Sequence, residues 1–282
     1  MSPYFKALLF SLPVVVASLV GGWLPTAKEF THAITQVFLS FVSGFMIGIA
    51  VLHILPHGID QIASVYTESS VQLGALSMVC GIVLMFGTLR LLSFHDHEPV
   101  STTYNAEGTA RTGSATWIAV IAGMSVHTLF EGFAIGSILS IDYVALDLST
   151  HTDVKVYSST LALGVVFAIV VHKPFDALTV VGVTKYAGVE KKSLWLTNVL
   201  FALICPFAAL IALFFLVEVL HDYEHIVGFL LAFVSGVFLC VALADLLPEA
   251  FRHQHDRLKI FIAFLCGLLL TWISLLFLPH MH

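Results

Sequence analysis

Two short stretches in the middle of the chain place ionisable side chains inside long apolar runs. One is HTLFE at residues 127–131, and the other is HKPFD at residues 172–176. Each pairs a histidine with a carboxylate four residues later, so both side chains of a pair share one face of a helix. Ionisable groups at mid-membrane depth are costly and usually mark an ion or proton path. Imidazole with carboxylate is also a ligand set for a divalent transition metal.

The two pairs can hold one ion between them if their helices are neighbours. The candidate ligands are His127, Glu131, His172 and Asp176. Two nitrogens and two oxygens suit Zn²⁺, and also Fe²⁺, Mn²⁺ or Co²⁺. A dication would neutralise two carboxylates whose burial is otherwise very costly, and Lys173 is the other candidate counter-ion. One such pair could simply lock two helices together, but two pairs on adjacent spans favour a functional site.

The composition indicates a helical membrane protein. Of the 282 residues, 59% are hydrophobic and only 11% are charged, whereas a soluble domain carries about 25% charged residues. The net charge is −6 and no Lys/Arg-rich patch is present, so a nucleic-acid partner is not expected. The four cysteines form no CxxC pair, which favours small buried side chains over a metal or disulfide framework.

Eight segments are long and apolar enough to cross a bilayer, which takes about 20 residues per helix. They are 5–24, 32–55, 71–92, 116–140, 159–185, 194–220, 225–248 and 258–278. With this division, nine of the 12 basic residues lie on one side of the membrane, in the first, third, fifth and seventh loops or at the span ends beside them. Cytoplasmic loops are rich in Lys and Arg. We therefore expect both termini to lie outside, in a plasma membrane or a bacterial inner membrane.

The first apolar run could instead be a cleaved signal peptide, but that reading would move most of the basic residues to the outer face. We therefore keep it as a span, and the fold class expected is an all-α polytopic membrane protein with eight transmembrane helices.

An internal repeat relates the second and seventh spans. Residues 41–57 read FVSGFMIGIAVLHILPH, and residues 233–249 read FVSGVFLCVALADLLPE, with no gap in the alignment. The two spans run in opposite directions, so we expect spans 1–3 and 6–8 to be inverted repeats around spans 4 and 5. Secondary transporters commonly have this architecture, with the substrate site near the midplane at the repeat interface. Residues 1–282 are therefore expected to form a single transmembrane transporter domain.

Polar residues lie toward both ends of the expected path. His53, His57 and Asp60 lie toward the outer face, and Asp245, Glu249, His253 and His255 lie toward the cytoplasm. We expect an outer vestibule, a midplane site and an inner vestibule. One bundle of helices would shift against the other and expose the site to each face in turn, by alternating access.

Four motifs resemble those of the Zrt/Irt-like (ZIP) family of metal-ion transporters. HTLFEGFAIG resembles the fourth-span signature H-[SN]-x-x-E-G-x-A-x-G, and HKPFD resembles the fifth-span motif. LHILPH and LADLLPE are similar to the second- and seventh-span motifs. The resemblance implies transport of zinc, or of Fe²⁺ or Mn²⁺, into the cytoplasm, with no enzymatic activity and no cofactor. It also suggests a homodimer, and it assigns the primary metal to His127, Glu131, His172 and Asp176.

The chain departs from the family pattern at two positions beside this site. Members with two adjacent metals carry Asn after the fourth-span histidine and an acidic residue at the second fifth-span position. Here these positions are Thr128 and Lys173. The Lys173 ammonium would occupy the place of a second cation, so we expect a single-metal site. Asp176 stands where many members have Glu or a non-ligand, which leaves the metal preference open.

Two other function classes remain open from the sequence. An intramembrane zinc-dependent hydrolase could hold Zn²⁺ with His53, His127 and His172 and use Glu131 as its base. Polar residues at both ends of the path argue against it, because an enzyme needs access from one side only. A proton-coupled carrier of another solute would use the pairs as a proton relay, and its transport would survive metal chelation.

Overall fold

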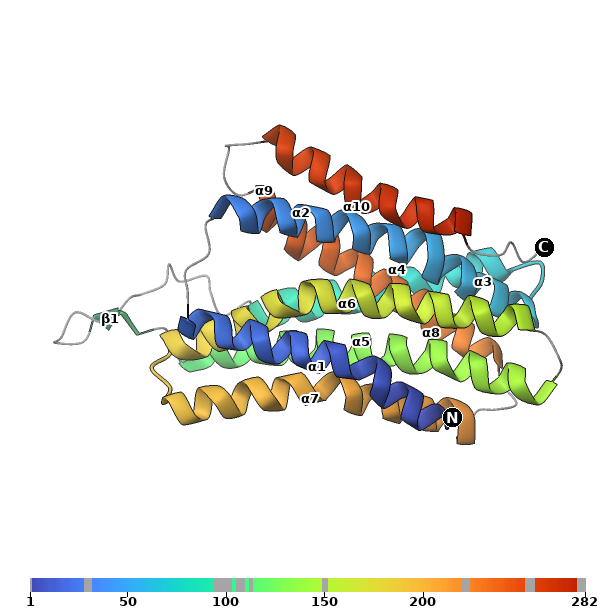
Figure 1. Ribbon diagram of the computed structural model, residues 1–282, viewed down its shortest axis with the longest axis horizontal. Helices are drawn as coiled ribbons and strands as arrows, with labels where there is room; N and C mark the ends of the chain where they lie inside the picture. Colours follow the sequence, from blue (N-terminus) through green and yellow to red (C-terminus); the bar gives the residue numbers. More distant parts are fainter. Residues whose placement is uncertain are drawn as a thin grey trace.

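Long helices make up nearly all of the chain that the structure describes (Figure 1). The computed structural model describes residues 2–27, 32–93, 103–104, 110–111, 114–148, 152–219, 224–251 and 257–277. Seven stretches of these residues are long and apolar enough to cross a membrane, and they coincide with the first seven predicted spans. A further helix of 21 residues lies where the eighth span is predicted. The prediction of an all-α polytopic membrane protein is confirmed.

The elements follow one another along the chain in a fixed order. They are α1 (Pro3–Ala27), α2 (His32–Gly48), η1 (Ile49–Ile54), α3 (Leu55–Ala63), α4 (Ser70–Ser93), β1 (Thr103–Tyr104), β2 (Ala110–Arg111), α5 (Ser114–Leu148), α6 (Thr152–Tyr186), α7 (Lys191–Phe214), η3 (Phe215–Val219), α8 (Glu224–Val241), η4 (Ala242–Leu246), α9 (Leu247–Phe251) and α10 (Arg257–Phe277). The three η segments are π-helical turns within longer helices. The two short strands pair antiparallel within the long polar loop after α4.

The second predicted span continues beyond its predicted end at residue 55. The chain remains helical through η1 and α3 to Ala63. Pro56 lies in the first turn of α3, directly after the π-helical turn η1, so its missing amide hydrogen falls where the backbone hydrogen-bond pattern changes and the chain stays helical.

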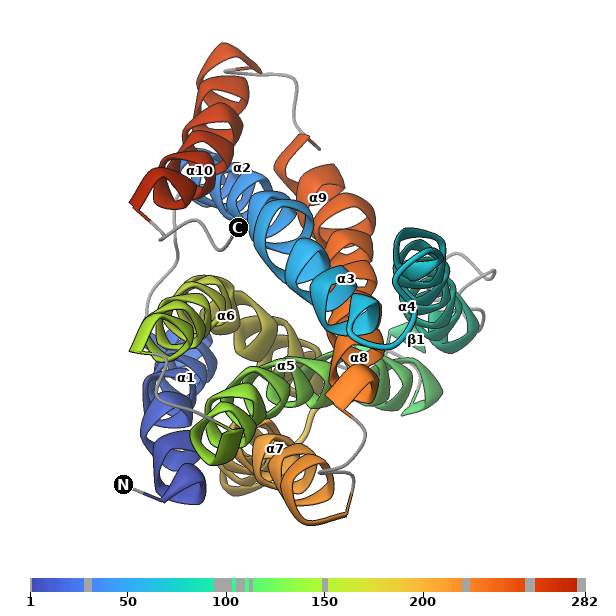
Figure 2. The same ribbon diagram turned by 90° about the vertical axis from the view of Figure 1, so that its right-hand side faces the viewer.

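The helices form two bundles, which are seen end-on in Figure 2. The first bundle contains α1, α5, α6 and α7, and the second contains α2, α3, α4, α8, α9 and α10. In the first bundle α1 packs on α6 and α7 packs on α5; in the second α2 packs on α10 and α8 packs on α4. In the inverted repeat, spans 1, 2, 3 and 4 correspond to spans 6, 7, 8 and 5. The α1–α6 pair (spans 1 and 5) therefore corresponds to the α7–α5 pair (spans 6 and 4), and the α2–α10 pair (spans 2 and 8) corresponds to the α8–α4 pair (spans 7 and 3). The packing thus follows the inverted repeat expected from the sequence.

Two glycines at equivalent places in the repeat allow neighbouring helices to approach closely. Gly44 of α2 and Gly236 of α8 are 192 residues apart, which is the offset of the repeat. A Cβ on Gly44 would lie 2.1 Å from the carbonyl oxygen of Phe264 in α10. A Cβ on Gly236 would lie 2.0 Å from that of Met78 in α4. Both contacts leave no room for a side chain.

A matched pair of substitutions on α4 tests this packing. We expect Gly81→Ala to lower the thermal unfolding temperature of the protein in detergent, because the added Cβ would lie 2.0 Å from the carbonyl oxygen of Phe233. Overpacking of this kind costs about 1–3 kcal/mol. Gly87→Ala is the control: its Cβ would meet nothing within 4 Å, and alanine gains up to about 1 kcal/mol in helix propensity. Equal unfolding temperatures for the two variants would contradict the close approach of α4 and α8.

Candidate metal centre

Four ionisable side chains from two neighbouring helices meet in the interior of the first bundle. His127 and Glu131 project from one face of α5, and His172 and Asp176 project from one face of α6. One ligand atom from each residue lies within 4.8 Å of the other three. All four side chains are buried, with at most 3% of any residue exposed. The structure therefore brings together both predicted pairs.

Glu131 lies at the centre of the cluster. Its Oε1 atom is 2.6 Å from Nε2 of His172 and 3.1 Å from Nε2 of His127. Oδ2 of Asp176 is 3.7 Å from Nε2 of each histidine. Two imidazole nitrogens and two carboxylate oxygens thus face one small volume, which is the donor set expected for a divalent transition metal ion.

Some of these polar atoms have no hydrogen-bond partner among the described residues. They are both ring nitrogens of His127 and Oδ2 of Asp176, although Nε2 of His127 lies 3.1 Å from Glu131 and Oδ2 of Asp176 forms a 3.5 Å ion pair with Lys173. A buried polar atom that makes no hydrogen bond costs about 1–3 kcal/mol, so such atoms call for an explanation. A cation bound among Nε2 of His127, Oδ2 of Asp176 and their neighbours would supply the missing interactions.

A backbone contact fixes the ring of His172. Its Nδ1 atom donates a hydrogen bond of 2.6 Å to the carbonyl oxygen of Ala168, one turn earlier in α6. The other ring nitrogen, Nε2, therefore points at Glu131. Metal-binding histidines are commonly oriented in this way, with one ring nitrogen donating to a carbonyl or carboxylate and the other facing the ion.

Lys173 is fully buried and reaches both carboxylates. Its Nζ atom lies 2.5 Å from Oε2 of Glu131 and 3.5 Å from Oδ2 of Asp176. It also donates to Oγ1 of Thr128 at 2.6 Å and lies 4.7 Å from the centre of the Phe201 ring. One lysine thus partly neutralises two carboxylates in the described structure, as the sequence predicts.

Close helix packing holds the two halves of the cluster in place. Pro174 of α6 has no amide hydrogen, so the carbonyl of Val170 loses its usual partner beside the site. α1 approaches there so closely that a Cβ on Gly21 would lie 2.3 Å from Cα of Pro174. On α5, a Cβ on Gly132 would lie 2.3 Å from the carbonyl oxygen of Cys205 in α7. Both flanking helices therefore lie directly against the cluster.

The predicted vestibule residues lie elsewhere. His53 and His57 are buried in η1 and α3 of the second bundle, and Asp60 is exposed. Asp245 and Glu249 belong to η4 and α9, whereas His253 and His255 lie outside the described residues. The described side chains of His53, His57 and Asp60 do not join the four-residue cluster.

The three-histidine set of a zinc hydrolase is not assembled in the part of the chain that the structure describes. Nε2 of His53 lies 3.1 Å from the carbonyl oxygen of Thr271 in α10. The described His, Cys, Asp and Glu side chains close enough to share an ion are only His127, Glu131, His172 and Asp176. His53 therefore contacts α10 and does not supply a third imidazole to this cluster.

Comparison with known proteins gives one consistent family. The family model described as ZIP Zinc transporter matches residues 94–274. The chain is 25% identical over 297 residues to Zinc transporter ZIP9 of Micropogonias undulatus, an alignment covering 91% of this chain and 89% of that protein. It is 23% identical over 293 residues to Zinc transporter ZIP9-B of Xenopus laevis, with the same coverage. Zinc transporter ZupT of Corynebacterium glutamicum is 26% identical over 278 residues, with 93% of this chain and 94% of that protein aligned.

Proposed function

Because this chain belongs to the ZIP zinc transporter family, we propose that it carries a divalent transition metal ion into the cytoplasm and that zinc is its main substrate. The observation that carries the proposal is the buried cluster of His127, Glu131, His172 and Asp176. Fe²⁺ and Mn²⁺ are the competing substrates, because the same donor set accepts them. The relatives are named as zinc transporters, which supports a transport function and not an enzymatic one.

We propose that the site holds a single ion. Nζ of Lys173 in α6 donates hydrogen bonds to Glu131 and Thr128 in α5. A second dication beside the first would have to displace this ammonium group or lie against it, and like charges in a buried site repel strongly.

We propose transport by alternating access, which the division into two bundles supports. All four proposed ligands come from α5 and α6 of the first bundle, while α8 and η1 of the second bundle contact these helices. A shift of the first bundle against the second would carry the ion with it. We propose that His53, His57 and Asp60 receive the ion on the outer side, and that Asp245, Glu249, His253 and His255 receive it on the inner side.

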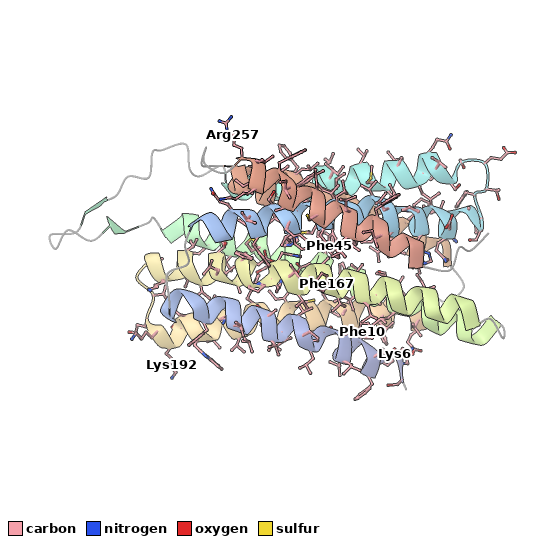
Figure 3. All side chains as sticks on the ribbon, turned by 45° about the horizontal axis from the view of Figure 1, so that its top comes forward. Lys6, Phe10, Phe45, Phe167, Lys192 and Arg257 are labelled. Atoms are coloured by element: carbon pink, nitrogen blue, oxygen red, sulfur yellow. The ribbon has the colours of Figure 1, made fainter. Side chains whose placement is uncertain are left out.

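The ends of the molecule differ in charge, which supports the proposed orientation. Figure 3 shows Lys192 and Arg257 at one end and Lys6 at the other. The positive-inside rule places the Lys192 end in the cytoplasm and both termini outside. We propose a plasma membrane or bacterial inner membrane protein whose 282 residues form one transporter domain, and which assembles as a homodimer.

Uptake of radioactive zinc into proteoliposomes tests the proposal. We expect the wild-type protein to take up zinc, and we expect His127→Ala to reduce the initial rate at low zinc concentration roughly tenfold or more, as loss of an important metal contact does. His225→Ala is the matched control, because His225 lies at the start of α8, away from the cluster. Competition by Fe²⁺ and Mn²⁺ ranks the substrates.

The outcomes separate the alternatives. Equal zinc uptake by the wild type and His127→Ala would place the site elsewhere. A folded wild type that moves no metal, but moves another solute in the presence of a chelator, would indicate a proton-coupled carrier of that solute.

A further inference from the structure

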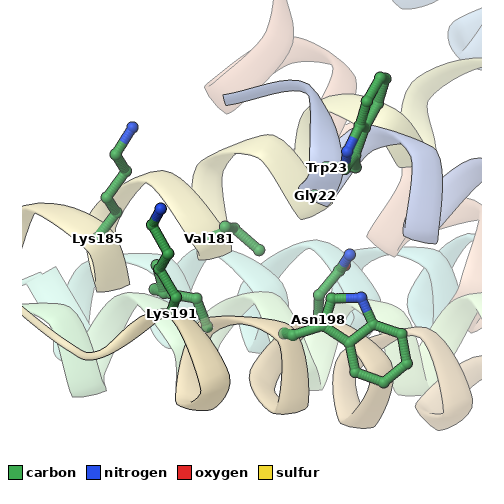
Figure 4. Close-up of a pocket in the computed structure, with 8 residues that line it drawn as sticks. Gly22, Trp23, Val181, Lys185, Lys191 and Asn198 are labelled. Atoms are coloured by element: carbon green, nitrogen blue, oxygen red, sulfur yellow. The ribbon is translucent and has the colours of Figure 1, made fainter. Parts of the chain in front are cut away.

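A cavity of about 510 Å³ opens among α1, α6 and α7, at the end of the first bundle where α6 ends and α7 begins. Figure 4 shows Lys185 and Lys191 at one end of it, with Trp23 and Asn198 at the other. None of its lining residues belongs to the four-residue cluster in the middle of α5 and α6. Its volume is within the range of ligand-binding pockets, about 300–1,000 Å³.

The charge of this cavity favours an anion. Two of its lining residues, Lys185 and Lys191, are basic, and none of them is acidic. Lys191 is also the first residue of α7, a helix of 24 residues. The amino end of a helix carries a partial positive charge and exposed amide hydrogens, which further favours an anionic group such as a phosphate.

Asn198 supplies a second, independent indication of a ligand. The residue is 4% exposed, and its Nδ2 atom donates a 3.1 Å hydrogen bond to the carbonyl oxygen of Leu19 in α1. Its Oδ1 atom is buried without a hydrogen-bond partner among the described residues. Asn198 lines the cavity, so a ligand that carries a hydroxyl group besides its negative charge would supply the partner that this acceptor lacks.

The remaining wall is apolar and aromatic. Trp23 and Trp195 line the cavity, and Trp195 is 67% exposed on the outer surface of the bundle. Tryptophan is enriched at the boundary between lipid and water, where its ring contacts the lipid acyl chains and its N–H group bonds to polar groups. A cavity with basic groups, a buried acceptor and an aromatic edge facing the bilayer matches the polar end of a lipid.

We propose that this cavity binds the headgroup of an anionic phospholipid that carries a hydroxyl group, with its phosphate between Lys185 and Lys191 and its hydroxyl group on Oδ1 of Asn198. The acyl chains leave the cavity past Trp195. In the proposed orientation the site lies in the cytoplasmic leaflet, where anionic lipids attract basic residues. The proposal does not depend on which ion the protein carries.

Native mass spectrometry of the delipidated full-length protein, titrated with phosphatidylglycerol or phosphatidylcholine, tests the site. We expect preferential retention of phosphatidylglycerol. The double variant Lys185→Gln/Lys191→Gln should lower that preference about tenfold or more, since each basic residue near an anionic lipid contributes appreciably to binding. The matched control is Lys192→Gln/Lys259→Gln, which removes the same charge from exposed lysines that do not line the cavity. Thermal unfolding without added lipid checks that the variants are folded.

Asn198→Ala tests the hydroxyl contact separately. It should reduce the preference for phosphatidylglycerol over phosphatidylmethanol, an anionic lipid whose headgroup has no hydroxyl group. Equal binding of phosphatidylcholine by the wild type would overturn the proposal. An equal loss of the preference for phosphatidylglycerol in the control Lys192→Gln/Lys259→Gln would also overturn it, because the lipid would then be responding to the overall surface charge. Displacement of the lipid by inorganic phosphate alone would assign the cavity to a free anion instead.

Discussion

Replacing Glu131 by Gln should nearly abolish zinc uptake while leaving the protein folded. Oε1 of Glu131 lies 2.6 Å from His172 and 3.1 Å from His127, and its Oε2 lies 2.5 Å from Lys173. A neutral amide of the same shape cannot supply the negative charge that all three groups face. The change also leaves the buried Lys173 ammonium with one carboxylate fewer, so we expect a lower thermal unfolding temperature, at a cost of up to about 3–5 kcal/mol. We expect zinc affinity, and uptake at low zinc concentration, to fall about 100-fold or more, because loss even of a group that only supports a metal ligand costs about 10- to 100-fold.

Initial uptake rates over a range of zinc concentrations, together with zinc binding to the purified protein by calorimetry, measure this effect. Ser140→Ala is a suitable control on the same helix, because the Ser140 hydroxyl is buried and donates only to the backbone of Ser137 at 2.7 Å. We expect that variant to retain uptake. If Glu131→Gln binds and transports zinc as the wild type does, the cluster is not the transport site.

Much of the architecture could be predicted because membrane helices have a simple sequence signal. A bilayer requires long apolar runs, and these runs locate seven of the membrane-spanning helices and α10. The repeated FVSG and Leu-Pro elements identified the inverted repeat. The continuation of the second span to Ala63 was missed, because Pro56 reads as the end of a helix unless it is known to lie in a first turn. The two-residue strands β1 and β2 are too short to produce a periodic pattern.

The site was predictable within each helix and less so between helices. A spacing of four residues places His127 above Glu131, and His172 above Asp176, in any helix. Contacts made by distant segments carry no such signal. The ring of Phe201 beside Lys173 belongs to α7, and its position depends on how α5 and α7 pack.

Long-range packing also determines the surroundings of His53. The sequence suggests a residue of an outer vestibule, and in the structure the side chain is buried and its Nε2 atom contacts the backbone of α10. That contact joins residues 218 positions apart, so no local pattern could reveal it. A role for His53 in the ion path remains a proposal that uptake kinetics of His53→Ala would test.

Lys173→Met should destabilise the zinc-free protein and make its stability depend on zinc. Lys173 is fully buried and is the described cation nearest to the carboxylates of Glu131 and Asp176, at 2.5 and 3.5 Å. Without it, two buried carboxylates lose their fixed partner, at a cost of about 3–5 kcal/mol. A bound dication would restore the charge balance. We therefore expect a lower unfolding temperature for Lys173→Met in the presence of a chelator, and a larger increase on adding zinc than the wild type shows.

The same position tests the number of ions. Lys173→Glu replaces the ammonium group with a third carboxylate, which would allow a second cation beside the first, so we expect the bound zinc to rise from one ion per chain to two. Lys192→Met, at an exposed lysine outside both the cluster and the cavity, is the control and should change neither the stoichiometry nor the response to zinc. An equal thermal response to zinc in Lys173→Met and the wild type would mean that the ion does not bind near Lys173. Two zinc ions in the wild type would mean that the ammonium group does not exclude the second one.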